Sequence, residues 1–116
     1  MTPEPQLIRA PHACDATLSR VFTLLGKRWN GVLIATLASG TVGFSDLKRA
    51  VAGISDSMLS ERLSELAKAG IVDRTVDTGP PVSVEYRLTD AGLALLPALD
   101  GLSNWAATNW PEPQKS

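Results

Sequence analysis

The fold of this chain is decided by residues 53–70, which read GISDSMLSERLSELAKAG. Apolar residues recur here at three- and four-residue steps, the spacing of one helix face: Leu59, Leu63, Leu66 and Ala67. Ser55 stands at a favoured N-cap position, and Gly70 stands just past the row, where left-handed backbone is common. The stretch therefore predicts an amphipathic helix with a defined start and end.

A shorter helix is predicted immediately before it. Ser45 and Asp46 can cap a helix that carries Leu47 and Val51, and Gly53 ends that helix. Two helices that meet across a short glycine-containing turn form a helix-turn-helix.

The periodicity changes from helical to alternating after Gly70. Residues 82–88 read VSVEYRL, in which every second residue is apolar, as in a half-buried strand. Residues 71–76 are the expected partner strand, and residues 77–81 connect the two. The order helix, turn, helix and hairpin is that of a winged helix-turn-helix, whose second helix enters the major groove of DNA.

Helical spacing recurs on both sides of this unit. Two helices are predicted ahead of it, one ending near Gly26 and one at Gly40. Their apolar rows are Leu18, Val21, Phe22 and Leu25, and then Trp29, Val32, Leu33 and Leu37. The dipeptide Asn30-Gly31 favours a hairpin, but its flanks do not alternate, so a helix is expected. A long last helix capped by Thr89 carries Leu95, Leu99, Leu102, Ala106 and Trp110 on one side.

The expected fold class is mainly α with a small β-hairpin: a winged helix-turn-helix with long N- and C-terminal helices for dimerisation. Residues 1–13 contain three prolines and no hydrophobic period, so we expect a flexible N-terminal arm. Residues 14–110 are expected to form the DNA-binding and dimerisation domain, and residues 111–116 a C-terminal tail.

Composition narrows the classes of function. The chain has 116 residues, of which 44% are hydrophobic and 20% charged, as in one globular domain. One cysteine and one histidine exclude an internal disulfide and a Cys/His metal cage, and no catalytic motif is present, so we expect no metal, no cofactor and no enzyme. No apolar run approaches the ~20 residues of a membrane helix and the start lacks a secretory signal, so a cytoplasmic protein without membrane contact is expected.

Charge is unevenly distributed along the chain. The net charge is −1, yet residues 20–68 hold seven Lys and Arg against four Asp and Glu. Such a segment can form a mildly basic face of the protein. An ordinary solvent-exposed helix surface has the same charge composition.

The sequence also resembles a known family, the HxlR-type winged helix-turn-helix transcriptional regulators, which are relatives of MarR-type regulators. The stretches that carry the resemblance are LGKRW at 25–29, FSDL at 44–47, GIS at 53–55, MLSERLSEL at 58–66, PP at 80–81, VEYRLT at 84–89, Gly92 and Trp105. Together they cover most of residues 14–110.

The resemblance implies a homodimer, held by the first and last helices, that binds a pseudo-palindromic operator in double-stranded DNA and regulates nearby genes; we expect a repressor. It makes residues 56–69 the recognition helix and the hairpin the wing. Many relatives carry a basic residue where Gly43, Ser57 and Ser83 stand here, and residues 77–83 at the wing tip hold no cation. This chain is therefore expected to bind the DNA phosphates more weakly than those relatives do.

The candidate site residues follow from this arrangement. For DNA binding they are Lys48, Arg49, Ser55, Ser57, Ser60, Glu61, Arg62, Ser64, Arg74 and Arg87. For the dimer interface they are Leu18, Phe22, Leu99, Leu102, Trp105 and Trp110. Arg62 has a second interpretation, because it stands beside the packed stripe and can pair with Asp46 or another acid instead of a phosphate.

Cys14 lies near the start of the first predicted helix, as does a cysteine with which several relatives sense oxidants or electrophiles. A helix N-terminus can lower the pKa of a thiol, but a single cysteine is also a small apolar packing residue. Packing is the expected role, and an oxidant or small-molecule effector acting at Cys14 is the alternative. For the whole protein, the alternative function is a protein-interaction or ligand-binding module with weak DNA binding.

Overall fold

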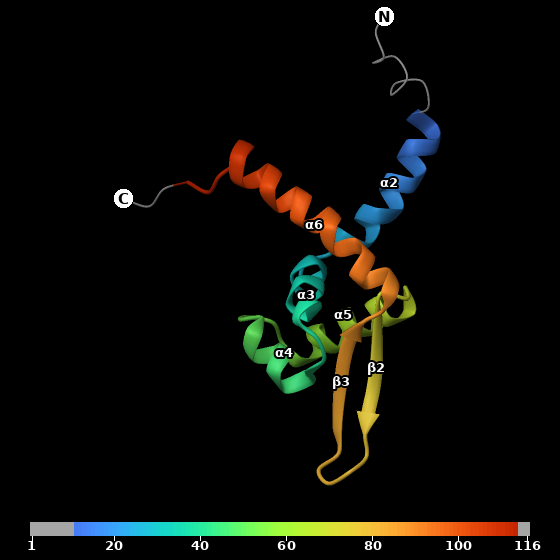
Figure 1. Cartoon of the computed structure of the whole chain (residues 1–116), viewed down its shortest axis with the longest axis vertical. Helices are drawn as coiled ribbons and strands as arrows, with labels where there is room; N and C mark the ends of the chain where they lie inside the picture. The colour runs from blue at the N-terminus through green and yellow to red at the C-terminus, as the bar shows by residue number, and fades with distance from the viewer. Residues whose placement is uncertain (1–10, 114–116) are drawn as a thin grey trace, which may run out of the picture.

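A computed structural model describes residues 11–113, with side chains from residue 16 onward. The helices are α2 (Pro11–Leu25), α3 (Asn30–Thr36), α4 (Phe44–Ala50), α5 (Asp56–Lys68) and α6 (Asp90–Asn109), with a 3-10 turn η1 (Leu37–Ser39). The strands are β1 (Val42–Gly43), β2 (Val72–Asp77) and β3 (Ser83–Leu88). Figure 1 shows the β2–β3 hairpin projecting from one end of the body, while α2 and α6 leave the other end in diverging directions. The predicted winged helix-turn-helix is confirmed.

The sheet is antiparallel and has the strand order β1-β3-β2. The hairpin was predicted correctly, but its connection covers residues 78–82, one position later than expected, because Asp77 still pairs with Ser83. β1 was not predicted as a strand, since two residues are too short to show an alternation. It pairs Val42 with Tyr86 and so joins the segment before α4 to the wing.

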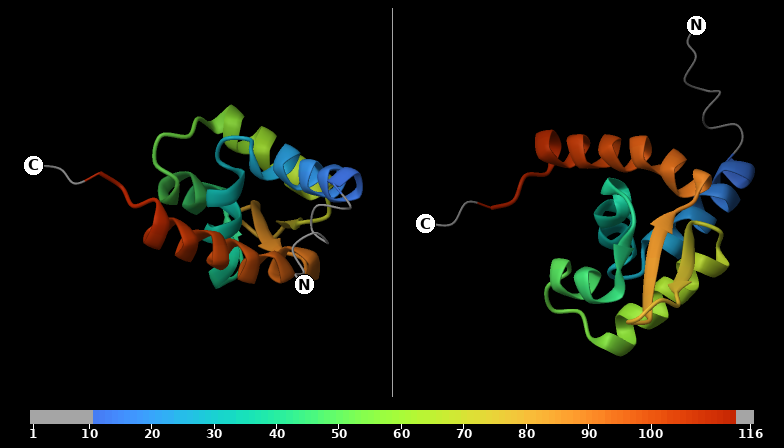
Figure 2. Two further views of the ribbon diagram at one scale, coloured as in Figure 1. Left: turned by 90° about the horizontal axis from the view of Figure 1, so that it is seen from above. Right: turned by 60° about the horizontal axis from the view of Figure 1, so that its bottom comes forward.

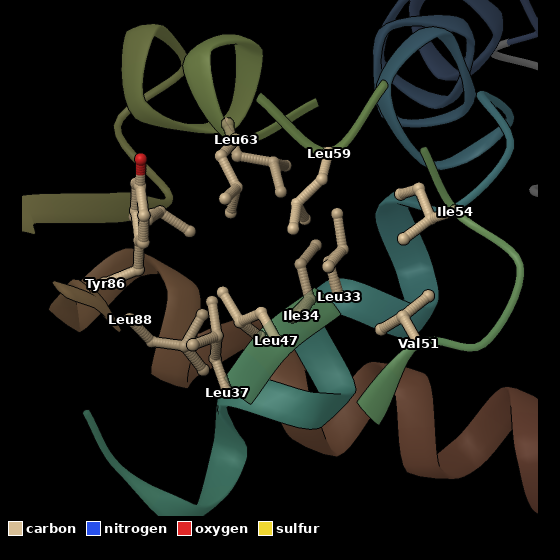
Figure 3. Packing of buried hydrophobic residues seen from close by; sticks show 12 residues of the cluster. Leu33, Ile34, Leu37, Leu47, Val51, Ile54, Leu59, Leu63, Tyr86 and Leu88 are labelled. Carbon is tan, nitrogen blue, oxygen red and sulfur yellow. The ribbon is translucent and has the colours of Figure 1, made fainter. Parts of the chain in front are cut away.

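The core forms where α5 packs against α3, α4 and β3. Leu59 and Leu63 of α5 are fully buried, and Figure 3 shows them facing Leu33 and Ile34 of α3. Tyr86 of β3 closes one side of this cluster. Burying a leucine side chain contributes about 1.5–3 kcal/mol, so this stripe fixes which side of α5 is left for solvent.

Both ends of α5 are as predicted. The Ser55 hydroxyl accepts a hydrogen bond from the Met58 amide at 3.1 Å. At the other end Gly70 adopts φ +80°, and its amide donates to the Ala67 carbonyl at 3.0 Å while Ile71 donates to Leu66 at 3.0 Å. These bonds form a Schellman motif, which satisfies the carbonyls that the helix end leaves free.

Two expected helix starts were wrong. α2 begins at Pro11, three residues before the expected domain boundary; proline suits a first helical position because the amide it lacks would have had no partner there. Residues 1–10 of the expected arm, and residues 114–116 of the tail, lie outside the described residues. α4 begins at Phe44 after the extended residue Gly43, so the expected caps Ser45 and Asp46 lie inside its first turn.

α3 differs from its predicted face by one position. Leu33, Ile34 and Leu37 are buried, whereas Val32 is 53% exposed. Asn30 takes part in the core instead, with its amide group donating to the Leu24 carbonyl at 2.8 Å. Figure 2 shows α3 lying beneath α6 at the centre of the body.

Candidate nucleic-acid interface

The side of α5 opposite the core carries a row of exposed polar side chains: Ser57, Ser60, Glu61, Ser64 and Lys68. Their spacing of three and four residues places them on the free face of the helix. Short hydroxyl side chains allow a close approach to DNA and can contact phosphates or base edges. Lys68 was not among the candidate DNA-binding residues, although the helical spacing that places the serines on this face also places Lys68 there.

A groove lies between this face of α5 and the wing. Its walls are formed by Ser60, Ser64 and Lys68 of α5 and by Arg74 of β2. Arg74 and Tyr86 are cross-strand partners, so their side chains are on the same face of the hairpin, the face that meets α5. Arg74 makes no ion pair with the residues that the structure describes, so its guanidinium is available to a ligand in the groove.

Three other candidate cations are paired with acids in the fold. Lys48 lies 3.1 Å from Asp56, Arg49 is paired with Asp46 one helical turn away, and Arg87 lies 3.5 Å from Asp73. Asp73 and Arg87 face each other across the hairpin on the side opposite Arg74. Each of these cations must leave or share its carboxylate before it contacts a phosphate.

Arg62 is buried, with 9% of its side chain exposed. Its guanidinium lies 2.9 Å from a Glu61 oxygen and 3.3 Å from a Glu65 oxygen. The expected DNA contact is thus not available from this position. The expected alternative, an ion pair with an acid, is observed, though with residues of its own helix and not with Asp46.

Glu65 also pairs with Lys27, which was not expected from the sequence. The Lys27 ammonium lies 2.5 Å from a Glu65 oxygen. This hydrogen bond lowers the pKa of the Glu65 carboxyl below its ordinary value of 4.5, burial opposes the shift, and the charge of Arg62 reinforces it. The pair spans 38 positions of sequence, so no local spacing could have identified it.

The candidate dimer residues are largely solvent-exposed in the single chain. Leu18 and Phe22 of α2 are about half exposed, and so are Leu102 and Trp105 of α6. Trp110, just past the end of α6, is 75% exposed, whereas Leu99 is partly buried against the core. Cys14 lies in the part of α2 whose side chains are outside the described residues.

The family model described as HxlR-like helix-turn-helix matches residues 24–114. The chain belongs to the HxlR-like family. This HxlR-family chain is 43% identical over 90 residues to the uncharacterized HTH-type transcriptional regulator YvaP of Bacillus subtilis, covering 78% of this chain and 82% of YvaP. Its resemblance to transcriptional regulators, expected from the sequence, is confirmed.

Two solved structures are also similar to this HxlR-family chain. The reduced form of the transcriptional regulator YodB from B. subtilis has a TM-score of 0.77 and 39% identity, covering 85% of this chain and 96% of YodB. YodB has also been solved after diamide treatment and with bound quinone. The redox regulator HypR in its reduced form has a TM-score of 0.75 and 31% identity, covering 80% of this chain and 92% of HypR.

This family member is a helix-turn-helix transcriptional regulator, and its relatives are named as regulators and not as enzymes. Within residues 11–113, every helix is too short or too polar to span a bilayer. Among residues 16–113, whose side chains the structure describes, no group of three His, Cys, Asp or Glu side chains is arranged to hold a metal ion.

Proposed function

We propose that this HxlR-family regulator binds a pseudo-palindromic operator in chromosomal DNA as a homodimer, acts in the cytoplasm as a repressor, and has no catalytic activity. The observation that carries the proposal is the row of exposed polar residues on α5 beside the Arg74 groove. α5 would enter the major groove with Ser57, Ser60 and Ser64 toward the base edges. Arg74 and Lys68 would hold the phosphate backbone that passes between α5 and the wing.

The proposed dimer rests on the apolar surface of α2 and α6. Leu18, Phe22, Leu102 and Trp105 expose large apolar side chains on the two helices that diverge from the body (Figure 1). Several large apolar side chains exposed on two helices of a small protein are typical of a protein interface. A two-fold axis through this surface would place two copies of α5 on successive major-groove faces of one duplex.

The operator is tested by selection from random duplexes with the purified protein. We expect enrichment of two inverted half-sites with centres about 10 base pairs apart. A duplex with that sequence should be shifted in a gel in a salt-dependent manner, and a scrambled duplex of equal composition should not. Failure to enrich any sequence, with binding to scrambled DNA equally weak, would favour the alternative of a protein-interaction or ligand-binding module.

An oxidant or electrophile as effector is a second proposal, and the redox states in which YodB and HypR have been solved favour it. The chain holds one cysteine, so any thiol response takes the form of a sulfenic acid, an adduct or a disulfide between two chains. If Cys14 is the sensor, diamide should change operator affinity in the parent and not in Cys14→Ser, with an adduct or a linked dimer in the intact mass. An identical response of both proteins would assign Cys14 to packing alone.

A further inference from the structure

The five residues 26–30 join α2 to the rest of the molecule, and they contact both α5 and the turn that precedes it. Lys27 reaches Glu65, which is three residues before the C-terminal end of the recognition helix. The ring of Trp29 lies against Gly53, two residues before the N-cap Ser55. The junction therefore contacts α5 through Glu65 and the turn that precedes α5 through Gly53.

The junction is itself rigidly built. Trp29 adopts φ +84°, a left-handed conformation that a bulky residue rarely takes and that the surrounding packing must maintain. The guanidinium of Arg28 lies 4.5 Å from the centre of the Trp29 ring. Asn30 is fully buried and donates back to the Leu24 carbonyl of α2, so the last turn of α2 is tied to the start of α3.

The Lys27–Glu65 ion pair connects this junction directly to α5, and the side chain of Asn30 also lies close enough to Glu65 to lower its pKa. Glu65 also holds the buried Arg62 on the inner side of the helix, so the carboxylate links the junction to the packed face of α5. The Lys27 and Glu65 side chains are 44% and 31% exposed. A pair of that exposure contributes little to global stability, so removing it should leave the fold intact.

We infer that Lys27 and Glu65 are positioning residues that fix α5 relative to α2 and thereby set the half-site spacing that the dimer accepts. The inference rests on the proposed function, because it assigns α2 to the dimer interface and α5 to the major groove. If α2 lies at the two-fold axis, its angle to α5 determines the separation of the two recognition helices. A link between the Lys27–Glu65 pair and half-site spacing is demonstrated only by changing these two residues and measuring the spacing preference.

The test compares Lys27→Gln with Arg20→Gln. Both remove one positive charge from or beside α2, and Arg20 lines the same hollow as Lys27 and Glu65 but makes no ion pair with the described residues. The comparison therefore separates loss of the Lys27–Glu65 pair from loss of a nearby positive charge. Operators with the selected spacing, with one base pair more and with one fewer are titrated by fluorescence anisotropy, together with a single half-site. In Lys27→Gln we expect the preference for the selected spacing to fall about three- to tenfold, with half-site affinity equal to that of Arg20→Gln.

A double-mutant cycle with Glu65→Gln tests whether Lys27 affects the spacing preference through its ion pair with Glu65. If the pair acts as a unit, Lys27→Gln in a Glu65→Gln background should change the spacing preference no further. Additive effects, or equal spacing profiles for the parent, Lys27→Gln and Arg20→Gln, would overturn the inference. Melting curves establish that each variant is folded before it is titrated.

A second measurement needs no DNA, so it separates this inference from the proposed function. Dyes are placed on α2 and α5 through Ser19→Cys and Ser64→Cys in the Cys14→Ser chain, and labelled chains are diluted into unlabelled protein. Energy transfer between the dyes should change or broaden in Lys27→Gln and stay unchanged in Arg20→Gln. Unchanged transfer in both variants would reject the positioning role, whereas a parent that selects no operator would reject only the proposed function.

Discussion

Ser60 lies where α5 and the wing meet in the proposed DNA interface. It is exposed on α5 and lines the groove together with Arg74 of β2. Ser60→Glu would place a negative charge against the phosphate backbone, so we predict loss of operator binding with the melting temperature nearly unchanged. Ser60→Ala, which removes the hydroxyl without adding charge, should weaken binding far less. Loss of fold and binding together in Ser60→Glu would instead place Ser60 in the core.

Arg74 and Arg87 lie on opposite faces of the wing, so the contribution of one positive charge to DNA binding can be compared between the two faces. Arg74 faces the groove without an ion pair among residues 11–113, whereas Arg87 is paired with Asp73. We predict that Arg74→Ala reduces the slope of log affinity against log salt by about 0.9 for each phosphate that a protomer no longer neutralises. Arg87→Ala should change the slope less. An equal change in both variants would mean that the Asp73 pair opens on DNA.

Glu65 predicts a pH dependence whose sign follows from its lowered pKa. A carboxyl with a lower pKa in the folded state stabilises that state above its ordinary value of 4.5, and this contribution is lost as pH falls through the lower folded value. Glu65→Gln should therefore be less stable than the parent in urea at neutral pH, and the difference should shrink at acid pH. Glu112→Gln, beyond α6, should follow the parent throughout. A pH-independent deficit in Glu65→Gln would indicate a packing effect.

At the scale of elements, local chemistry made most of the fold predictable. Ser55, Gly70 and Thr89 are caps whose partners lie within a few residues, and the structure shows the bonds that the sequence predicts. The features that could not be predicted depend on distant partners. β1 is a strand only because β3 lies beside it, and Arg62 is buried only because α5 packs against the body on that side. The serine face of the site and an acid partner for Arg62 were predictable from the sequence. The Lys48–Asp56 and Arg87–Asp73 pairs join different elements and were not.

Two glycines of α6 give opposite predictions within one helix. A Cβ at Gly92 would lie 2.3 Å from the Ile71 carbonyl oxygen and 3.1 Å from Leu88, so Gly92→Ala should destabilise by about 1–3 kcal/mol. A Cβ at Gly101 would meet no described atom within 4 Å, and Gly101→Ala should stabilise by about 0.5–1 kcal/mol. Urea unfolding at one protein concentration measures both. Changes of the same sign would contradict the placement of α6 against Ile71 and β3.

At the scale of the whole molecule, the exposed apolar residues of α2 and α6 predict a dimer. Light scattering at micromolar concentration should give twice the chain mass. Leu102→Glu, which would bury a charge in that interface, should raise the dimer dissociation constant about 30-fold or more, as removal of an interface hot spot does. Val82→Glu carries the same change on the exposed wing and should leave the dimer intact. A monomer mass for the parent would contradict two-fold operator recognition.

The carboxylates that hold Lys48, Arg49 and Arg87 also affect how the regulator is distributed in a cell. Unpaired cations supply the affinity of a protein for arbitrary DNA, and a chromosome offers an enormous excess of such decoy sites. With these three cations already paired, the regulator would be retained less by decoys and would find its target by free diffusion more than by sliding along the duplex. Little of the protein would then be bound to non-specific chromosomal DNA. Occupancy of the operator would therefore change in direct response to the number of protein copies in the cell.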